Sequence, residues 1–323
     1  MDEKMIIVWI LLGILLLLFI ATYVIYRICF GEYRLEKDFT PEQLMPVGEE
    51  YVPYKEMIMR GIKRVWEAPC EIVEVTSHDG ITLRARYYHR TDGAPAVLMM
   101  HGYRGNAFRD GNGIFYFTQK YGFNLLMPDE RAHGISDGRM ITFGIKERWD
   151  CKTWTEYLTE RFGKEQRIMF CGLSMGAATV LMASDTGLPE NVTGIMADCG
   201  FSSPKEIICS VMKSIQLPAG LLYPLVKLGA RLFGGVDLEE ASAVESVKNC
   251  KIPVLLFHGE ADTFVPCYMS RMCEEACASE TELLTVPGAG HGMSYCLKAE
   301  EYEAAVDRLF VKAFGEDACK PVK

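Results

Sequence analysis

Apolar residues are most concentrated at the N-terminus of the chain. From Met5 to Tyr26 there is no charged residue, and an apolar run of this length spans the hydrocarbon core of a bilayer as one helix. Trp9 lies near one end of the run and Tyr23 near the other, where aromatic rings favour the membrane interface. We therefore expect residues 1–30 to form a transmembrane anchor.

A cleaved signal peptide and a buried core helix are the two alternatives for this segment. A signal peptide has a basic start, a shorter apolar region and a small-x-small cleavage site, whereas this chain starts Met-Asp-Glu-Lys and has no good site. A core helix is rarely apolar over so many residues. Because Lys4 precedes the run and Arg27 and Arg34 follow it, the positive-inside rule places the C-terminal part of the chain in the cytoplasm.

After the anchor the pattern becomes irregular and then alternates between strands and helices. Residues 31–69 have no steady period and contain several prolines, so we expect a connector with short helices. Residues 71–77 and 81–88 alternate in polarity around His78-Asp79-Gly80 and predict a hairpin. Further short apolar runs predict buried strands at 96–100, 124–128, 167–171, 194–197, 253–258 and 281–286.

Stretches of helical spacing lie between most of these runs, at 146–162, 266–278 and 299–314. Continuous apolar strands that are interleaved with helices predict an α/β fold, with a mainly parallel central sheet covered by helices on both faces.

One interval is too long for a plain connection between strands. About fifty residues separate Cys199 from Cys250, and the centre of this interval, SIQLPAGLLYPLVKLGARLFGG, is apolar and helix-like. We expect a helical lid at about 203–245 that covers the carboxyl ends of the strands and shapes an acyl pocket; an ordinary crossover helix with a long approach is the alternative. The predicted organisation is an anchor (1–30), a connector (31–69) and one α/β domain (70–318).

Composition narrows the choice of partners. A formal net charge of −9 leaves no basic stripe to replace phosphate counterions, which argues against nucleic acid. The twelve cysteines are scattered rather than evenly spaced, which indicates reduced thiols. One local cluster of cysteines consists of Cys267, Cys273, Cys277 and Cys296. Its spacing is not that of a zinc finger or ribbon, so we predict no metal and no cofactor.

The pentapeptide Gly172-Leu173-Ser174-Met175-Gly176 joins a strand-like run to a helix-forming run. A serine on so tight a strand-to-helix turn needs small neighbours, and the two glycines supply them. Its hydroxyl is then held out of the fold at the positive end of the helix, as a nucleophile requires. The motif alone is common, and a Gly-rich turn without chemistry is the alternative.

Other loops at predicted strand ends supply the partners that a serine nucleophile needs. Asp262 follows the strand at 253–258, and His291 lies in the Gly-flanked loop after the last strand. The backbone N–H groups of Tyr103, in the turn after 96–100, and of Met175 are the candidate oxyanion donors. The chain order is Ser174, Asp262, His291, which is serine, acid, histidine.

At this point the chain resembles the α/β-hydrolase superfamily, from about Cys70 to Phe314. The resemblance rests on five segments in the family's order: HGYRGN (101–106), DERAHGISDG (129–138), GLSMG (172–176), HGEADTFVP (258–266) and GAGHG (288–292). Within the superfamily the chain looks like the lid-bearing serine hydrolases related to monoacylglycerol lipases and serine aminopeptidases, and like membrane-anchored bacterial members of that group.

The resemblance also sorts the remaining candidates. It implies structural or oxyanion-loop roles for His101 and His258, and a loop-fixing role for His133. Asp198 is the alternative acid, because it also ends a predicted strand and some family members place the acid there. We favour Asp262 because Val265 and Pro266 continue its D-x-x-V-P pattern. We interpret Asp129, a third carboxylate at a strand end, as structural.

These residues predict a serine hydrolase that cleaves a carboxylic ester or related acyl bond through a Ser-His-Asp triad and an acyl-enzyme intermediate. The expected substrate is a small acyl ester or a lipid. An aminopeptidase-type serine peptidase and a thioesterase are alternatives, and a catalytically silent, membrane-tethered binding protein is a further one.

Overall fold

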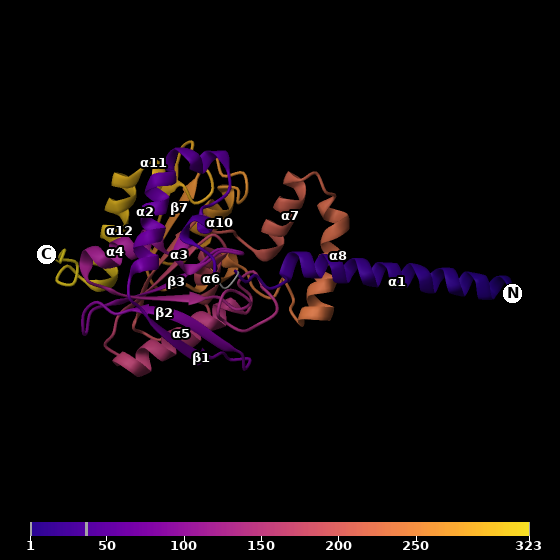
Figure 1. The fold of residues 1–323 in the computed structure, drawn as a ribbon, viewed down its shortest axis with the longest axis horizontal. Helices are drawn as coiled ribbons and strands as arrows, with labels where there is room; N and C mark the ends of the chain where they lie inside the picture. The colour runs from indigo at the N-terminus through magenta and orange to yellow at the C-terminus, as the bar shows by residue number, and fades with distance from the viewer. Residues whose placement is uncertain (1, 36–37, 323) are drawn as a thin grey trace.

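The computed structural model describes residues 2–35 and 38–322, and one eight-stranded sheet forms the centre of this part of the chain (Figure 1). The strand order is β1-β2-β4-β3-β5-β6-β7-β8. β1 and β2 form the predicted hairpin, β2 pairs antiparallel with β4, and all later pairings are parallel. The strands are β1 (Glu71–Thr76), β2 (Thr82–Tyr88), β3 (Ala96–Met100), β4 (Asn124–Asp129), β5 (Ile168–Leu173), β6 (Val192–Asp198), β7 (Val254–Gly259) and β8 (Thr281–Val286).

Helices cover both faces of the sheet, which confirms the predicted fold class. Along β5, Ile168 and Phe170 contact one apolar core and Met169 and Cys171 contact the other, so the strand is apolar throughout instead of alternating. One core includes α5 (Glu147–Phe162), α6 (Met175–Ala183) and α10 (Tyr268–Ala276). The other includes α2 (Lys55–Glu67), α4 (Asn112–Tyr121) and α12 (Ala299–Phe314).

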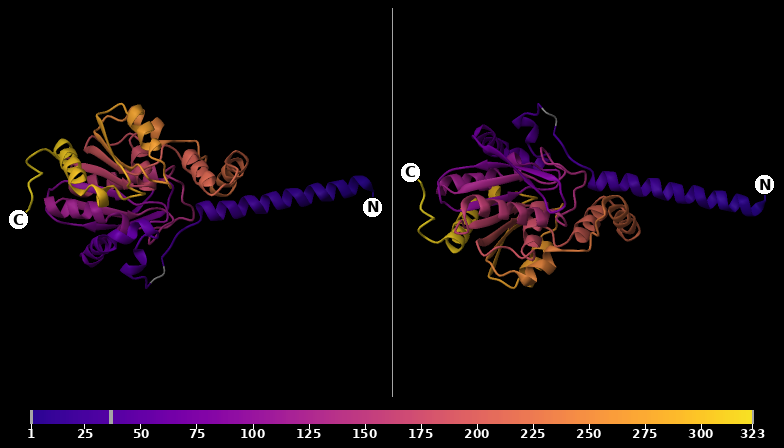
Figure 2. Two further views of the ribbon diagram at one scale, coloured as in Figure 1. Left: turned by 90° about the horizontal axis from the view of Figure 1, so that it is seen from above. Right: turned by 90° about the horizontal axis from the view of Figure 1, so that it is seen from below.

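The expected anchor segment forms a single helix, α1 (Glu3–Phe30), that projects from the domain (Figures 1 and 2). It is long and apolar enough to cross a membrane by length and composition, a test that a signal sequence also passes. Most of it is exposed, and Thr22, Tyr26 and Phe30 in its last turns are buried.

The last turns of α1 pack on the insertion after β6. That insertion contains α7 (Pro204–Ser214) and α8 (Ala219–Gly234), which form a helical hairpin beside α1. The ring of Phe233 on α8 lies 5.3 Å from Phe19, 5.1 Å from Tyr23 and 5.4 Å from Tyr26, measured between ring centroids. The hairpin and the end of α1 therefore form one packed unit.

The connector is ordered where the structure describes it. Two short 3-10 helices, η1 (Pro41–Leu44) and η2 (Glu49–Tyr54), lead directly into α2. The Tyr51 hydroxyl donates a hydrogen bond to the His291 carbonyl oxygen at 2.9 Å. The connector thus reaches the carboxyl edge of the sheet. The remaining short helices are α3 (Ala107–Asp110), α9 (Ala243–Ser246), η3 (Val247–Asn249) and α11 (Ser294–Leu297).

Candidate active site

Ser174 lies at the turn between β5 and α6, in a backbone conformation that few residues adopt. Its φ is 55° and its ψ is −112°, which is sterically costly for a residue with a Cβ. A Cβ on Gly172 would lie 2.3 Å from the carbonyl carbon of Gly176, and one on Gly176 would lie 2.1 Å from the Met100 carbonyl oxygen. Both glycines are therefore required by close backbone packing, as the sequence predicts, and they hold Ser174 at the tip of the turn.

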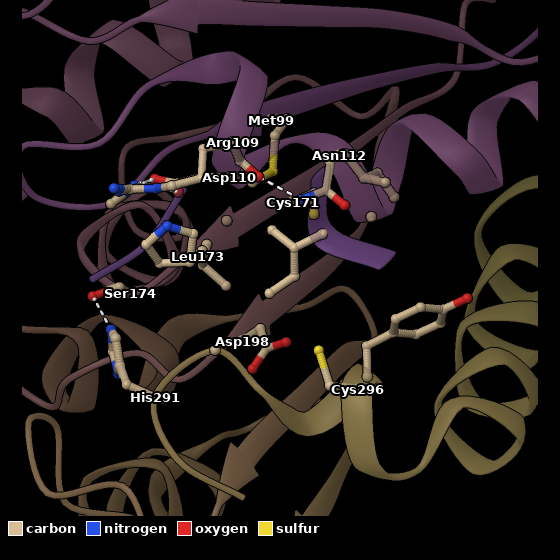
Figure 3. A pocket seen from close by; sticks show the side chains of 18 of the residues that line it. Met99, Arg109, Asp110, Asn112, Cys171, Leu173, Ser174, Asp198, His291 and Cys296 are labelled. Carbon is tan, nitrogen blue, oxygen red and sulfur yellow. Dashed lines mark hydrogen bonds and ion pairs between the residues drawn. The ribbon is translucent and has the colours of Figure 1, made fainter. Parts of the chain in front are cut away.

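The structure brings Ser174, His291 and Asp262 together although the chain separates them widely. The Ser174 hydroxyl lies 3.0 Å from His291 Nε2, and His291 Nδ1 lies 2.6 Å from Asp262 Oδ2 (Figure 3 shows the first of these contacts). Because a carboxylate only accepts, the partners assign the proton to Nδ1, and Nε2 then accepts from the serine. The three side chains form a continuous hydrogen-bonded chain.

The surroundings of Asp262 hold its carboxylate ionised. Its Oδ1 accepts hydrogen bonds from the backbone N–H groups of Phe264 and Val265, each at 2.9 Å. Burial alone raises the pKa of Asp262, but the hydrogen bonds from His258 and His291 outweigh it and hold this pKa well below its usual range. His258 is itself buried, with Nδ1 2.7 Å from Ser270 Oγ and Nε2 2.8 Å from the Val265 carbonyl oxygen. His258 Nε2 also lies 3.4 Å from Asp262 Oδ2, so this imidazole helps to hold the carboxylate in place.

The two residues whose backbone N–H groups the sequence singles out, Met175 and Tyr103, lie close to Ser174. Met175 is the first residue of α6, so no carbonyl of that helix accepts its N–H. Tyr103 lies in the turn after β3, and within residues 2–35 and 38–322 its N–H has no hydrogen-bond partner. The next loop residue is fixed in place, because the backbone N–H of Arg104 donates to His133 Nε2 at 3.1 Å.

The loop after β3 is hydrogen-bonded to the end of α1. The Tyr103 hydroxyl donates to the Cys29 carbonyl oxygen at 2.9 Å, and Arg104 Nη2 donates to the Ile28 carbonyl oxygen at 2.7 Å. These carbonyls belong to the last turn of α1, where no residue of the helix pairs with them and positive charge is favoured.

A cavity of about 340 Å³ opens beside Ser174. Most of its wall is apolar or sulfur-containing, with Met99, Cys171 and Met196 from the strands. The connector supplies a further part of the wall, through Pro46, Val47, Tyr51, Met57 and Ile58. Figure 3 shows several of these side chains around Ser174 and His291.

The insertion at 203–245 does not line this cavity, contrary to our expectation that it shapes the acyl pocket. Among the described residues around the cavity, none comes from that range. The physical reason is that α8 packs against the last turns of α1.

Asp198, the alternative acid, makes different contacts. It lines the cavity and is buried, and its Oδ2 accepts a hydrogen bond from the Tyr302 hydroxyl at 3.0 Å. Burial raises the pKa of Asp198. In the described part of the chain its carboxylate has no hydrogen bond to His291, so the geometry favours Asp262 as the partner of the histidine.

The other strand-end residues that the sequence singled out have structural contacts. His101 Nδ1 donates to the Gly102 carbonyl oxygen at 2.9 Å, and its Nε2 accepts from the Glu130 N–H at 3.0 Å. Asp129 pairs with Arg86 at 2.9 Å. These contacts fix the loops that surround the site.

Three residues beside the site have no signal in the sequence that distinguishes them. Arg109 pairs with Asp110 at 2.6 Å, and Asp110 Oδ2 accepts from the Gly102 N–H at 2.9 Å, which anchors the loop after β3. Cys199 Sγ lies 3.8 Å from His291 Nε2, and burial raises the pKa of its thiol well above the ordinary value. Their positions follow from tertiary packing and not from a motif.

Comparisons with known proteins agree with the fold. The family described as alpha/beta hydrolase fold matches residues 95–220. The uncharacterized protein YqkD of Bacillus subtilis is 24% identical over 236 residues, which are 73% of this chain and 77% of that protein. The bifunctional esterase/perhydrolase DCH of Acinetobacter calcoaceticus is 23% identical over 267 residues, covering 68% of this chain and 92% of its own. Among solved structures, the Pyrococcus furiosus esterase Pf2001 superposes with a TM-score of 0.66 at 23% identity, covering 89% of this chain and 99% of its own.

Proposed function

We propose that this chain is a serine hydrolase of the α/β-hydrolase superfamily, whose family model matches residues 95–220, and that it cleaves a carboxylic ester through an acyl-enzyme intermediate. The observation that carries this proposal is the continuous hydrogen-bonded chain from Ser174 through His291 to Asp262, with contacts of 3.0 and 2.6 Å. The cavity beside Ser174 supports it, since a small-molecule substrate needs an enclosed, mainly apolar site with few polar groups.

In the first half of the proposed reaction, His291 Nε2 takes the proton of the Ser174 hydroxyl while Oγ attacks the ester carbonyl carbon. Ionised Asp262 orients the imidazole through Nδ1 and stabilises its positive charge. The N–H groups of Tyr103 and Met175 donate to the oxyanion as it forms. His291 then gives its proton to the leaving alcohol, and the acyl group remains on Ser174.

In the second half, water replaces the alcohol. His291 takes a proton from the water molecule while the water oxygen attacks the acyl carbon. His291 then returns the proton to Ser174 Oγ as the acid product leaves. The reaction needs no redox partner, and every proton passes through one imidazole.

The charges around the cavity favour an ester or thioester over a peptide with a free N-terminus. An aminopeptidase needs an ionised acid to bind the substrate's α-ammonium group. Asp262 is engaged with His291, and Asp110 is paired with Arg109. Asp198, the remaining carboxyl among the described residues that line the cavity, accepts a hydrogen bond from the Tyr302 hydroxyl, and burial raises its pKa.

For localisation we propose that α1 is a retained, single-pass membrane anchor and that the catalytic domain lies on the cytoplasmic side. The length and exposed apolar surface of α1 support the anchor. The buried contacts of its last turns with the domain also support retention, because cleavage of this segment would uncover them.

A fluorophosphonate probe tests the enzymatic proposal. We expect the full chain in detergent micelles to be labelled, and labelling to be lost in Ser174→Ala because the nucleophile is gone. Ser202→Ala is the control, since Ser202 is a buried serine beyond β6 that does not line the cavity. Absence of labelling in folded protein contradicts the proposal. A series of esters of graded acyl length, assayed beside an aminopeptidase substrate, then identifies the preferred acyl group.

A further inference from the structure

The α7–α8 hairpin exposes an apolar face that the proposed reaction does not use. On α8, the exposed side chains Leu221, Leu228 and Leu232 recur at helical spacing and form one stripe. Ile215 and Leu217, in the turn between α7 and α8, are also exposed. We call these five residues the hairpin patch. None of them lines the cavity beside Ser174.

The opposite face of α8 is buried, which fixes the direction of the stripe. Tyr223, Val226 and Ala230 are buried against the domain and α1. These positions lie across the helix from Leu221 and Leu228, so the stripe points away from the domain. Leu221 is 72% exposed, and an apolar side chain so exposed on a contiguous stripe indicates a binding surface.

The patch lies next to the exposed part of α1. A Cβ on Gly229 would lie 3.1 Å from the Thr22 carbonyl oxygen, so α8 and α1 touch almost backbone to backbone. α8 lies across α1 at the end of the domain from which α1 projects (Figures 1 and 2). The exposed apolar surface of α1 therefore lies beside α8, the helix that carries three of the five residues of the hairpin patch.

The level at which α8 crosses α1 is the edge of the proposed membrane span. About 20 residues of helix cross the hydrocarbon core, and 20 residues counted from Met5 end at Val24. Phe233 of α8 packs on Phe19 and Tyr23, which lie in the last part of this count. A helix that crosses α1 at this level lies along the membrane surface, with its outer stripe toward the acyl chains.

We propose that the hairpin patch is a second membrane contact, in which α8 lies in the bilayer interface with Leu221, Leu228 and Leu232 among the acyl chains. This inference rests on the proposed membrane anchor. The charged groups beside the stripe fit the headgroup level. Lys227 pairs with Glu239 and Arg231 with Asp237, so this region carries little net charge and the contact is mainly apolar.

Photo-crosslinking in vesicles of phosphatidylcholine and phosphatidylglycerol tests the contact. The photoreactive amino acid p-benzoylphenylalanine replaces one residue at a time in the full chain: Leu228 in the patch, Leu12 in α1, or Val311 on α12. Val311 is the matched control, because its exposure of 37% is similar to the 44% of Leu228 and α12 lies on the far side of the domain from α1. We expect lipid adducts at positions 12 and 228, at least tenfold above position 311.

The outcomes separate the two proposals. Adducts at position 12 but only background at 228 overturn the hairpin contact and leave the anchor intact. Absence of adducts at position 12 overturns the anchor and with it the hairpin contact. A crosslink from position 228 to a second protein chain, without lipid adducts, identifies another copy of this chain as the occupant and also overturns the proposal.

Discussion

The turn at Ser174 and the contact between α8 and α1 both depend on a glycine, but they tolerate change differently. At the turn, a Cβ on Gly176 would lie 2.1 Å from the Met100 carbonyl oxygen, which belongs to a central strand. At the helix contact, a Cβ on Gly229 would meet atoms of α1 at 3.1 Å and beyond. A central strand does not shift, whereas one helix slides on another by a few tenths of an ångström. The position of Ser174 is therefore fixed by close backbone packing, whereas the contact between α8 and α1 depends on packing that can adjust.

The largest effect is expected within the fixed region, at the acid. Asp262→Asn keeps the shape of the side chain but removes the charge that orients His291, so kcat for a soluble ester should fall about 10⁴-fold. Asp198→Asn is the matched control and should lower kcat less than about 10-fold, because Tyr302 is the hydrogen-bond partner of Asp198. Steady-state kinetics with the soluble ester measure kcat of both variants. The opposite ranking would move the catalytic acid to Asp198.

A paired alanine substitution tests the comparison between the two glycines directly. Gly176→Ala should destabilise the protein by about 3 kcal/mol and remove most of the turnover, because overpacking against the β3 carbonyl displaces Ser174. Gly229→Ala should change stability by no more than about 1 kcal/mol, since the helix propensity of alanine offsets the tighter contact with α1. Denaturation in detergent micelles and ester turnover measure both effects. Equal losses in the two variants would show that the regions are equally rigid.

The smallest effect is expected where the two regions meet. Arg104→Ala removes the hydrogen bond of 2.7 Å to the Ile28 carbonyl oxygen, which is worth about 1 kcal/mol, and should lower kcat a few-fold by loosening the loop that carries Tyr103. Arg161→Ala is the control, since it breaks an exposed ion pair with Glu71 far from the site. Kinetics with a water-soluble ester compare the two. Unchanged turnover in Arg104→Ala would mean that α1 does not help to position the loop.

Local chemistry explains why much of the fold and of the candidate site could be predicted from the sequence. The buried strands are visible because the residues of β5 from Ile168 to Cys171 contact one or the other of two cores, which makes this run apolar throughout. Ser174, Asp262 and His291 are visible because each follows a strand in a loop with glycines nearby. Parallel strands then bring these loops to one edge of the sheet. Their catalytic roles stay predictions.

Long-range packing explains what the sequence did not reveal. Nothing in the pattern of residues 31–69 indicates that Tyr51 and Ile58 form part of the cavity wall. The pattern of 203–245 predicts the helices that the structure shows, but it does not predict which part of the chain they pack against. In the structure α8 packs on α1 and does not close the cavity. Arg109 and Asp110 form an ion pair, and Asp110 accepts a hydrogen bond from a backbone N–H of the loop after β3. No spacing pattern in the sequence predicts that these two residues hold this loop.

Hydrogen bonds from Tyr103 and Arg104 to the last carbonyls of α1 join the helix directly to the domain, without a flexible linker between them. An enzyme on a flexible tether samples a volume whose radius grows with the square root of the tether length. If α1 anchors the domain as we propose, this radius is small, so the cavity stays at one height and one tilt above the lipid. We expect an enzyme held in this way to select substrates by where their scissile bond lies along the membrane normal, as well as by their chemistry.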